Sequence, residues 1–147
     1  MTEVVTRRAA MPLLVCALIW SHTVVAQQLS GNIGSSAKWG SSWIDLGQAT
    51  SFLSGQVLKI TLQDDSARSV LVRLLPVGAS PDEPAGLVGT QGLPVAKRVV
   101  IVPLSKDYPN IKQISVHGGE KAWDYNLGSG NGPARILTVE LVPANRQ

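Results

Sequence analysis

The stretch VLKITLQDDSARSVLVRLLP, from Val57 to Pro76, decides the fold class of this chain. From Val57 to Gln63 apolar and polar residues alternate, which gives an extended chain one apolar face. Asp-Asp-Ser at 64–66 is typical of a turn. The alternation then resumes until Pro76, which ends a strand because proline cannot donate to the ladder. The stretch therefore predicts two antiparallel strands joined as a hairpin, with Arg73 on the face away from the core.

Similar strand patterns recur along the rest of the chain. Residues 111–117 alternate, and so do residues 135–142, where Leu137, Val139 and Leu141 form the expected inward set. Residues 98–104, in contrast, are apolar on both faces, which predicts a strand that is covered on both sides.

About six or seven strands at this spacing predict an all-β fold, an antiparallel β-sandwich of the jelly-roll type. A small β-barrel is the alternative, because patterning does not distinguish closure from stacking. We expect residues 43–147 to form this single domain. The Gly/Ser-rich residues 27–42 are expected to be partly extended or mobile.

Residues 1–26 have the features of a secretory signal peptide. Arg7 and Arg8 precede an apolar run over residues 12–25, and a small-residue cleavage site ends at Ala26. The run is too short and too interrupted for a typical membrane span, although an N-terminal anchor is the alternative. The sequence therefore predicts export to the periplasm or the medium, with no membrane span after the signal is removed.

Composition excludes several functions. The only cysteine, Cys16, lies in the predicted signal, so disulfides, thiol catalysis and thiolate metal sites are not expected in the exported domain. The net charge of the 147-residue chain is only +3, and its lysines and arginines are scattered. Because nucleic-acid binding usually needs a basic patch, we do not expect it.

A glycine-rich connection, SVHGGEKAWDYNLGSGNGPARI from Ser115 to Ile136, holds the residues best suited to a ligand. Its glycines allow tight turns and close approach of backbone to backbone. Its aromatic rings lie next to carboxylate and amide groups, a mixture that suits sugars. The alternative is that tryptophans plug the core, which is the expectation for Trp43. The candidate ligand-binding residues are Trp39, His117, Trp123, Asp124, Tyr125 and Asn126.

Catalysis is not expected. Ser115 and His117 lie in line on one strand, without a nucleophile elbow or an evident third group to orient the imidazole. His117 is instead expected to be a surface group that titrates near its usual value. One histidine is too few for a zinc site, and the acidic residues follow no calcium-loop spacing, although a structural calcium stays open. We expect no catalytic residue, no metal ligand set and no cofactor.

The strand rhythm and aromatic loops resemble small exported β-sandwich domains, including galactose-binding-like jelly rolls, over roughly residues 43–142. No functional residue can be carried over, because the resemblance involves no motif. Our first hypothesis is an exported, non-catalytic domain that binds carbohydrate or cell-envelope glycan through the aromatic loop. The second is a protein-interaction or envelope-stress module that binds an envelope protein, and the third, disfavoured, is a hydrolase.

Overall fold

The computed structural model of the chain describes residues 25–79, 86–122 and 125–144. The predicted signal peptide lies outside these ranges, except for its last two residues. The secondary-structure elements in these ranges are all strands, and no helix there is long and apolar enough to cross a membrane. The strands are β1 (Gln27–Gln28), β2 (Gly31–Ser36), β3 (Ser41–Phe52), β4 (Val57–Leu62), β5 (Ser69–Pro76), β6 (Leu87–Ala96), β7 (Val99–Pro103), β8 (Tyr108–His117), β9 (Lys121–Ala122), β10 (Tyr125–Asn126) and β11 (Ile136–Val142).

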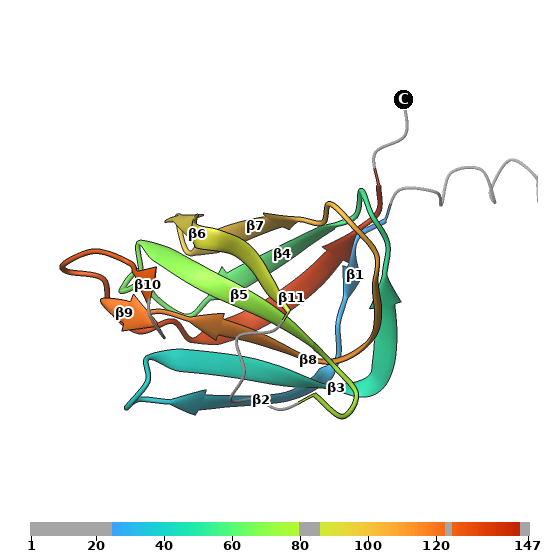
Figure 1. Cartoon of the computed structure of the whole chain (residues 1–147), viewed down its shortest axis with the longest axis horizontal. Coiled ribbons are helices and arrows are strands. Elements are labelled where there is room, and N and C mark those ends of the chain that lie inside the picture. Colours follow the sequence, from blue (N-terminus) through green and yellow to red (C-terminus); the bar gives the residue numbers. More distant parts are fainter. Residues whose placement is uncertain (1–24, 80–85, 123–124, 145–147) are drawn as a thin grey trace, which may run out of the picture.

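Nine of these strands form one antiparallel sheet in the order β1-β11-β4-β7-β6-β5-β8-β3-β2, and β9 and β10 form a separate small hairpin. The large sheet curls strongly into a half-barrel (Figure 1). The all-β, antiparallel prediction is therefore confirmed, but the predicted two-sheet sandwich is wrong. The reason is β6, which pairs with β5 between Leu87 and Pro94 and with β7 at Val95 and Ala96, so that the two walls remain parts of one sheet.

The predicted hairpin between the two strands of the deciding stretch is also wrong. Both strands form, but β4 lies between β11 and β7, whereas β5 lies between β6 and β8. The connection crosses from one wall of the half-barrel to the other and is anchored there. Ala67 is 2% exposed, and the Ser66 carbonyl accepts a hydrogen bond from the Gly132 N–H at 2.7 Å. The alternation of apolar and polar residues indicates which face of a strand is apolar, but it does not indicate which strand lies beside it in the sheet.

The core fills the inside of the curl. The inward sets predicted from alternation on β4, β5 and the end of β8 are confirmed, and Phe52 at the end of β3 is fully buried with them. The buried side chains that these strands contribute are Leu58, Ile60, Leu62, Val70, Val72, Leu74, Ile114 and Val116.

Two predictions about apolar faces fail on the opposite wall. A register shift between Ile136 and Thr138 changes the phase of β11, so that Ile136 is buried and Leu137, predicted inward, is 49% exposed. On β7, Ile101 is also 49% exposed, which shows that this strand is covered on one face only. A continuous apolar run therefore does not by itself indicate burial on both sides.

The Gly/Ser-rich residues 27–42, expected to be partly extended or mobile, contain β1 and β2, the two edge strands of the sheet. β1 pairs with β11 and β2 pairs with β3. Between them the Leu29 N–H donates to the Val139 carbonyl at 2.8 Å, and the Ser30 carbonyl accepts from the Gly47 N–H at 3.2 Å. The backbone groups of two adjacent residues, Leu29 and Ser30, thus bond to β11 and β3, which lie next to the two edges of the sheet. The chain crosses the opening of the half-barrel here (Figure 1).

Candidate functional site

The predicted ligand-binding residues that the structure describes fall mainly at one end of the half-barrel, which we call the loop end: the turn at 37–40 and residues 118–122 and 125–135. The Gly40 carbonyl in the turn accepts hydrogen bonds from the N–H groups of Gly118 (2.9 Å) and Ala134 (3.0 Å), which joins the two segments. Trp39 is 66% exposed at this end, with the Lys38 ammonium 4.9 Å from the centre of its ring. Trp39 is therefore available to a ligand.

The rest of the predicted aromatic site is less well suited to binding. Trp123 and Asp124 lie outside the described residues. Tyr125 is half-buried in β10, opposite Ala122. Asn126 is exposed, but its Oδ1 accepts a hydrogen bond from the Gly128 N–H at 2.9 Å, which closes a local turn.

Asn131 organises the loop end, and sequence reasoning did not select it. Its side chain is 5% exposed, and its Oδ1 accepts from the N–H groups of Arg68 (2.6 Å) and Ser69 (3.0 Å). Its Nδ2 donates to the carbonyls of Ser69 (3.0 Å) and Gly119 (2.7 Å). The amide therefore fixes the loop to the start of β5.

Glycine is needed at this end for close packing, as the sequence predicted. A Cβ on Gly118 would lie 2.6 Å from the Ala134 nitrogen, and one on Gly132 would lie 2.7 Å from the Ser66 carbonyl oxygen. Gly118 and Gly132 thus serve the packing of the backbone.

His117 lies on the outer face of the sheet beside Ser115, and their Nε2 and Oγ atoms are 3.0 Å apart. Arg73, directly opposite Ser115 on β5, is on the predicted outer face yet only 1% exposed. Burial, and secondarily the charge of Arg73, lowers the pKa of His117 to about 4. The expectation of a surface histidine with an ordinary pKa is therefore wrong.

Trp43 belongs to the same outer face. It pairs with Gly34 and with Ser115, and a Cβ on Gly34 would approach its indole to 2.7 Å. The neighbouring Ile44 is the residue that enters the core, at 2% exposed. The prediction that Trp43 plugs the core is wrong, because alternation directs it to the other face.

This outer-face pair is a poor nucleophile and base. Ser115 is 4% exposed, so its hydroxyl is not open to a substrate. An imidazole with a pKa near 4 is also a weak base at neutral pH. Among the described residues, no group of three or more His, Cys, Asp or Glu side chains could hold a metal ion.

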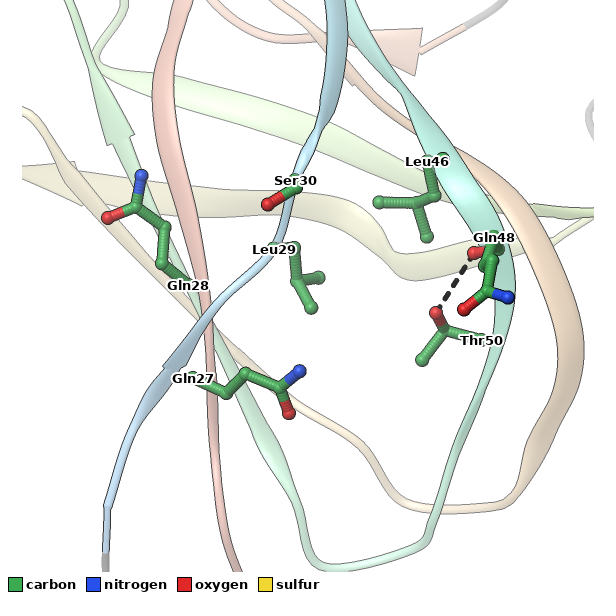
Figure 2. Close-up of a pocket in the computed structure, with 8 residues that line it drawn as sticks. Gln27, Gln28, Leu29, Ser30, Leu46, Gln48 and Thr50 are labelled. Atoms are coloured by element: carbon green, nitrogen blue, oxygen red, sulfur yellow. Dashed lines mark hydrogen bonds between the residues drawn. The ribbon is translucent and has the colours of Figure 1, made fainter.

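The opposite end of the half-barrel has a hollow that sequence reasoning missed. This β1–β3 pocket has a volume of about 300 Å³ and opens between β1 and the second half of β3. Figure 2 shows Gln27 and Gln48 extending toward it from the two strands, with the Leu29 and Leu46 side chains between them. The residues that line the pocket are Gln27, Gln28, Leu29, Ser30, Leu46, Gly47, Gln48 and Thr50.

An irregularity in β3 shapes this pocket. Asp45 pairs with Gln113 and Thr50 pairs with Ile111, so that the residues between them bulge from the ladder. The Lys112 ammonium caps the bulge by donating to the Leu46 carbonyl at 2.5 Å and to the Gly47 carbonyl at 3.3 Å. The Thr50 hydroxyl donates to the Gln48 carbonyl at 3.1 Å.

A faint signal of the pocket exists in the sequence. Every second residue of β3 from Ile44 to Phe52 reads Ile, Leu, Gln, Thr, Phe, so two polar residues interrupt an apolar row. Gln48 and Thr50 are those residues, and both line the pocket. In the structure Gln48 is exposed and Thr50 is half-buried, so the bulge keeps both polar side chains in reach of solvent.

Comparison with protein-family models, with curated proteins and with solved structures found no match. The case for a function therefore rests on the geometry and chemistry of these two ends.

Proposed function

We propose that the protein is an exported, non-catalytic binding domain whose ligand is a neutral carbohydrate or cell-envelope glycan bound in the β1–β3 pocket. The observation that carries the proposal is the lining of this pocket. It combines amide and hydroxyl side chains with two leucines, and no ionisable side chain lines it.

This lining matches the chemistry of a sugar. Each amide offers both a donor and an acceptor, and each sugar hydroxyl can use either. Leu29 and Leu46, at 7% and 3% exposed, belong to the core and form the floor of the pocket, so its polar side chains are the main groups that a ligand would contact. The side chains that line the pocket are amides, hydroxyls and leucines, with no arginine, lysine or histidine among them to form an ion pair with a phosphate or carboxylate. A neutral, hydroxyl-rich ligand is therefore favoured.

The aromatic version of the site receives weaker support. The exposed Trp39 could stack on a sugar, but Tyr125 is half-buried and Asn126 already accepts a local hydrogen bond. We assign Trp39 at most an additional contact with an extended glycan, because its turn lies at the opposite end of the half-barrel from β1 (Figure 1).

Calorimetric titration with a panel of neutral oligosaccharides and envelope glycan fragments tests the pocket. Gly47→Phe is a blocking variant, because a Cβ at Gly47 has no atom within 4 Å and the residue lines the pocket. We expect at least tenfold weaker binding in Gly47→Phe and in Gln48→Ala. The control, Gln63→Ala, changes an exposed glutamine outside the pocket and should bind normally. Undiminished binding by Gly47→Phe would contradict the proposal.

Export is a separate part of the proposal and has its own test. Expression of the full gene in a bacterial host, followed by N-terminal sequencing of the recovered protein, should give a chain that begins at Gln27. A protein that keeps Met1 and stays with the membrane fraction would contradict export and support the anchor.

The alternative function, a module that binds an envelope protein, is favoured by one feature. The exposed side chains of Ile101 and Leu137 lie on β7 and β11, the two neighbours of β4. Exposed apolar side chains on the two strands that flank β4 could form part of a protein contact. Crosslinking in the native envelope that captures one protein, and that fails in Ile101→Lys, would favour this function over glycan binding.

A further inference from the structure

Among the residues that the structure describes, one edge of the nine-stranded sheet is formed by β2, which pairs with β3 on one side and ends the strand order on the other. Its sequence, GNIGSS, has no charge and no proline, and its register with β3 has no bulge. Natural edge strands usually carry one of these features, since a bare edge pairs with other strands. β1, at the other edge, spans only two residues.

The register with β3 determines which backbone groups of β2 point outward. The Ser30 carbonyl accepts from the Gly47 N–H at 3.2 Å just before the strand, and bonded pairs alternate along an antiparallel ladder. The N–H and C=O groups of Gly31, Ile33 and Ser35 consequently face the free edge.

Ile33 is an independent indication that a strand belongs beside this edge. It pairs with Ile44, which is 2% exposed in the core, and the two side chains share the inward face of the sheet. Ile33 is nevertheless 46% exposed. An inward apolar side chain at a free edge loses this exposure when another strand is added.

We propose that a second copy of this chain docks on the β2 edge, with the two β2 strands antiparallel around a two-fold axis at Ile33. In this register Ile33 of one copy lies opposite Ile33 of the other, and Gly31 lies opposite Ser35. The outward backbone groups of both copies are then bonded.

The composition of β2 suits a second copy in particular. The inward side chains beside Ile33 are those of Gly31 and Ser35, which leave room for the contact between the two isoleucines. No charge lies within the strand, so the copies do not repel along the edge, and the two-fold axis places the two Lys38 residues at opposite ends of the pair. The contact consists of one six-residue strand from each copy, which is small for a protein interface. We therefore expect a monomer–dimer equilibrium with a dissociation constant in the micromolar range or weaker.

Sedimentation velocity over a range of concentrations tests the dimer, with the full gene product recovered from an exporting host. Ile33→Lys places like charges at the two-fold axis, and Leu137→Lys is the matched control, because Leu137 is 49% exposed on β11. We expect wild type and Leu137→Lys to shift from monomer to dimer, and the dissociation constant of Ile33→Lys to rise at least tenfold.

Two further variants guard against misfolding and against a different interface. Ser35→Pro removes one outward N–H, which edge strands tolerate, and should weaken the dimer while leaving the circular dichroism spectrum unchanged. In a Cys16→Ser background, Ile33→Cys should oxidise to a covalent dimer and Leu137→Cys should not, since directly opposite bonded residues are about 5.5 Å apart at Cα.

A wild type that stays monomeric at the highest concentration reached would overturn the proposal. So would equal dimerisation of wild type and Ile33→Lys, or a monomer whose β2 edge is occupied only by a strand of another protein.

Discussion

The two ends of the half-barrel differ in how they use polar residues. At the loop end, polar groups bond to the protein itself: the four hydrogen bonds of Asn131 stay inside the fold, and the Asn126 Oδ1 accepts from the Gly128 N–H. At the pocket end, Gln27 and Gln48 extend toward an open hollow. The described polar residues of the loop end thus serve mainly the fold, and we propose the pocket end, with its glutamines, as the binding site.

The comparison shows that the type of a side chain does not reveal whether its hydrogen-bonding groups are free to contact a ligand. An amide side chain that is 5% exposed, such as Asn131, stabilises the fold because its partners are backbone groups. The same group at Gln48, which is exposed at the pocket, can bind a ligand. Burial and hydrogen-bond partners decide between these roles.

The largest effect is expected from Asn131→Ala, which would show that the loop end is architecture. Removal of the amide leaves backbone groups of Arg68, Ser69 and Gly119 without partners in a buried place. We expect a loss of about 3 kcal/mol in the free energy of unfolding. Asn126→Ala is the control and should cost less than about 1 kcal/mol. Urea denaturation of both variants checks this, and equal stability of the two would contradict it.

The next effect is pH dependence at His117. Its pKa is about 4 in the folded protein against 6.5 for the ordinary group, so the unfolded chain binds the proton more tightly. The stability that this histidine contributes is complete above pH 6.5 and is lost as the pH falls from 6.5 to 4. The whole shift corresponds to about 3 kcal/mol, and because the ring is only half-buried we expect about 2 kcal/mol from this group. His117→Gln should lose less stability than wild type over this pH range, and parallel urea-denaturation curves for the two proteins would contradict the assignment.

A smaller effect is expected at the pocket end from Lys112→Met. This change removes the ammonium that caps the Leu46 and Gly47 carbonyls but keeps most of the side-chain volume. We expect a loss of about 1 kcal/mol in stability and a larger proportional loss in glycan affinity, because the bulge positions Gln48 and Thr50. Lys59→Met, on the outer face of β4, is the control for loss of a positive charge. Unchanged glycan affinity in Lys112→Met would show that the bulge does not depend on this cap.

Sequence reasoning predicted the strands and most of their inward faces, because period-two alternation is a local property. It did not predict which strands pair. The alternation of β4 and β5 is the same whether they form a hairpin or lie on opposite walls, and the anchor at Ser66 comes from Gly132, far along the chain. It also misassigned Leu137, since one irregular position in β11 changes the phase of the residues near it.

The candidate site was harder to predict than the fold. Trp39 is exposed as a binding residue should be, but the half-buried His117 has a pKa that no sequence pattern indicates. The pocket combines residues from β1 with residues from the bulge in β3, and both the bulge and the crossing of the chain at Leu29 depend on tertiary contacts. Gln27 and Gln48 line the same pocket only because the curl of the sheet brings β1 close to the second half of β3.

The most direct test of the account is a map of amide chemical shifts in a ¹⁵N-labelled protein titrated with the neutral oligosaccharide that binds most tightly. We predict saturable shifts for Gln28, Gln48 and Thr50, with Gly118 and Asn131 unaffected. Shifts confined to the turn at 37–40 and residues 118–131 would place the ligand at the loop end and contradict the central claim.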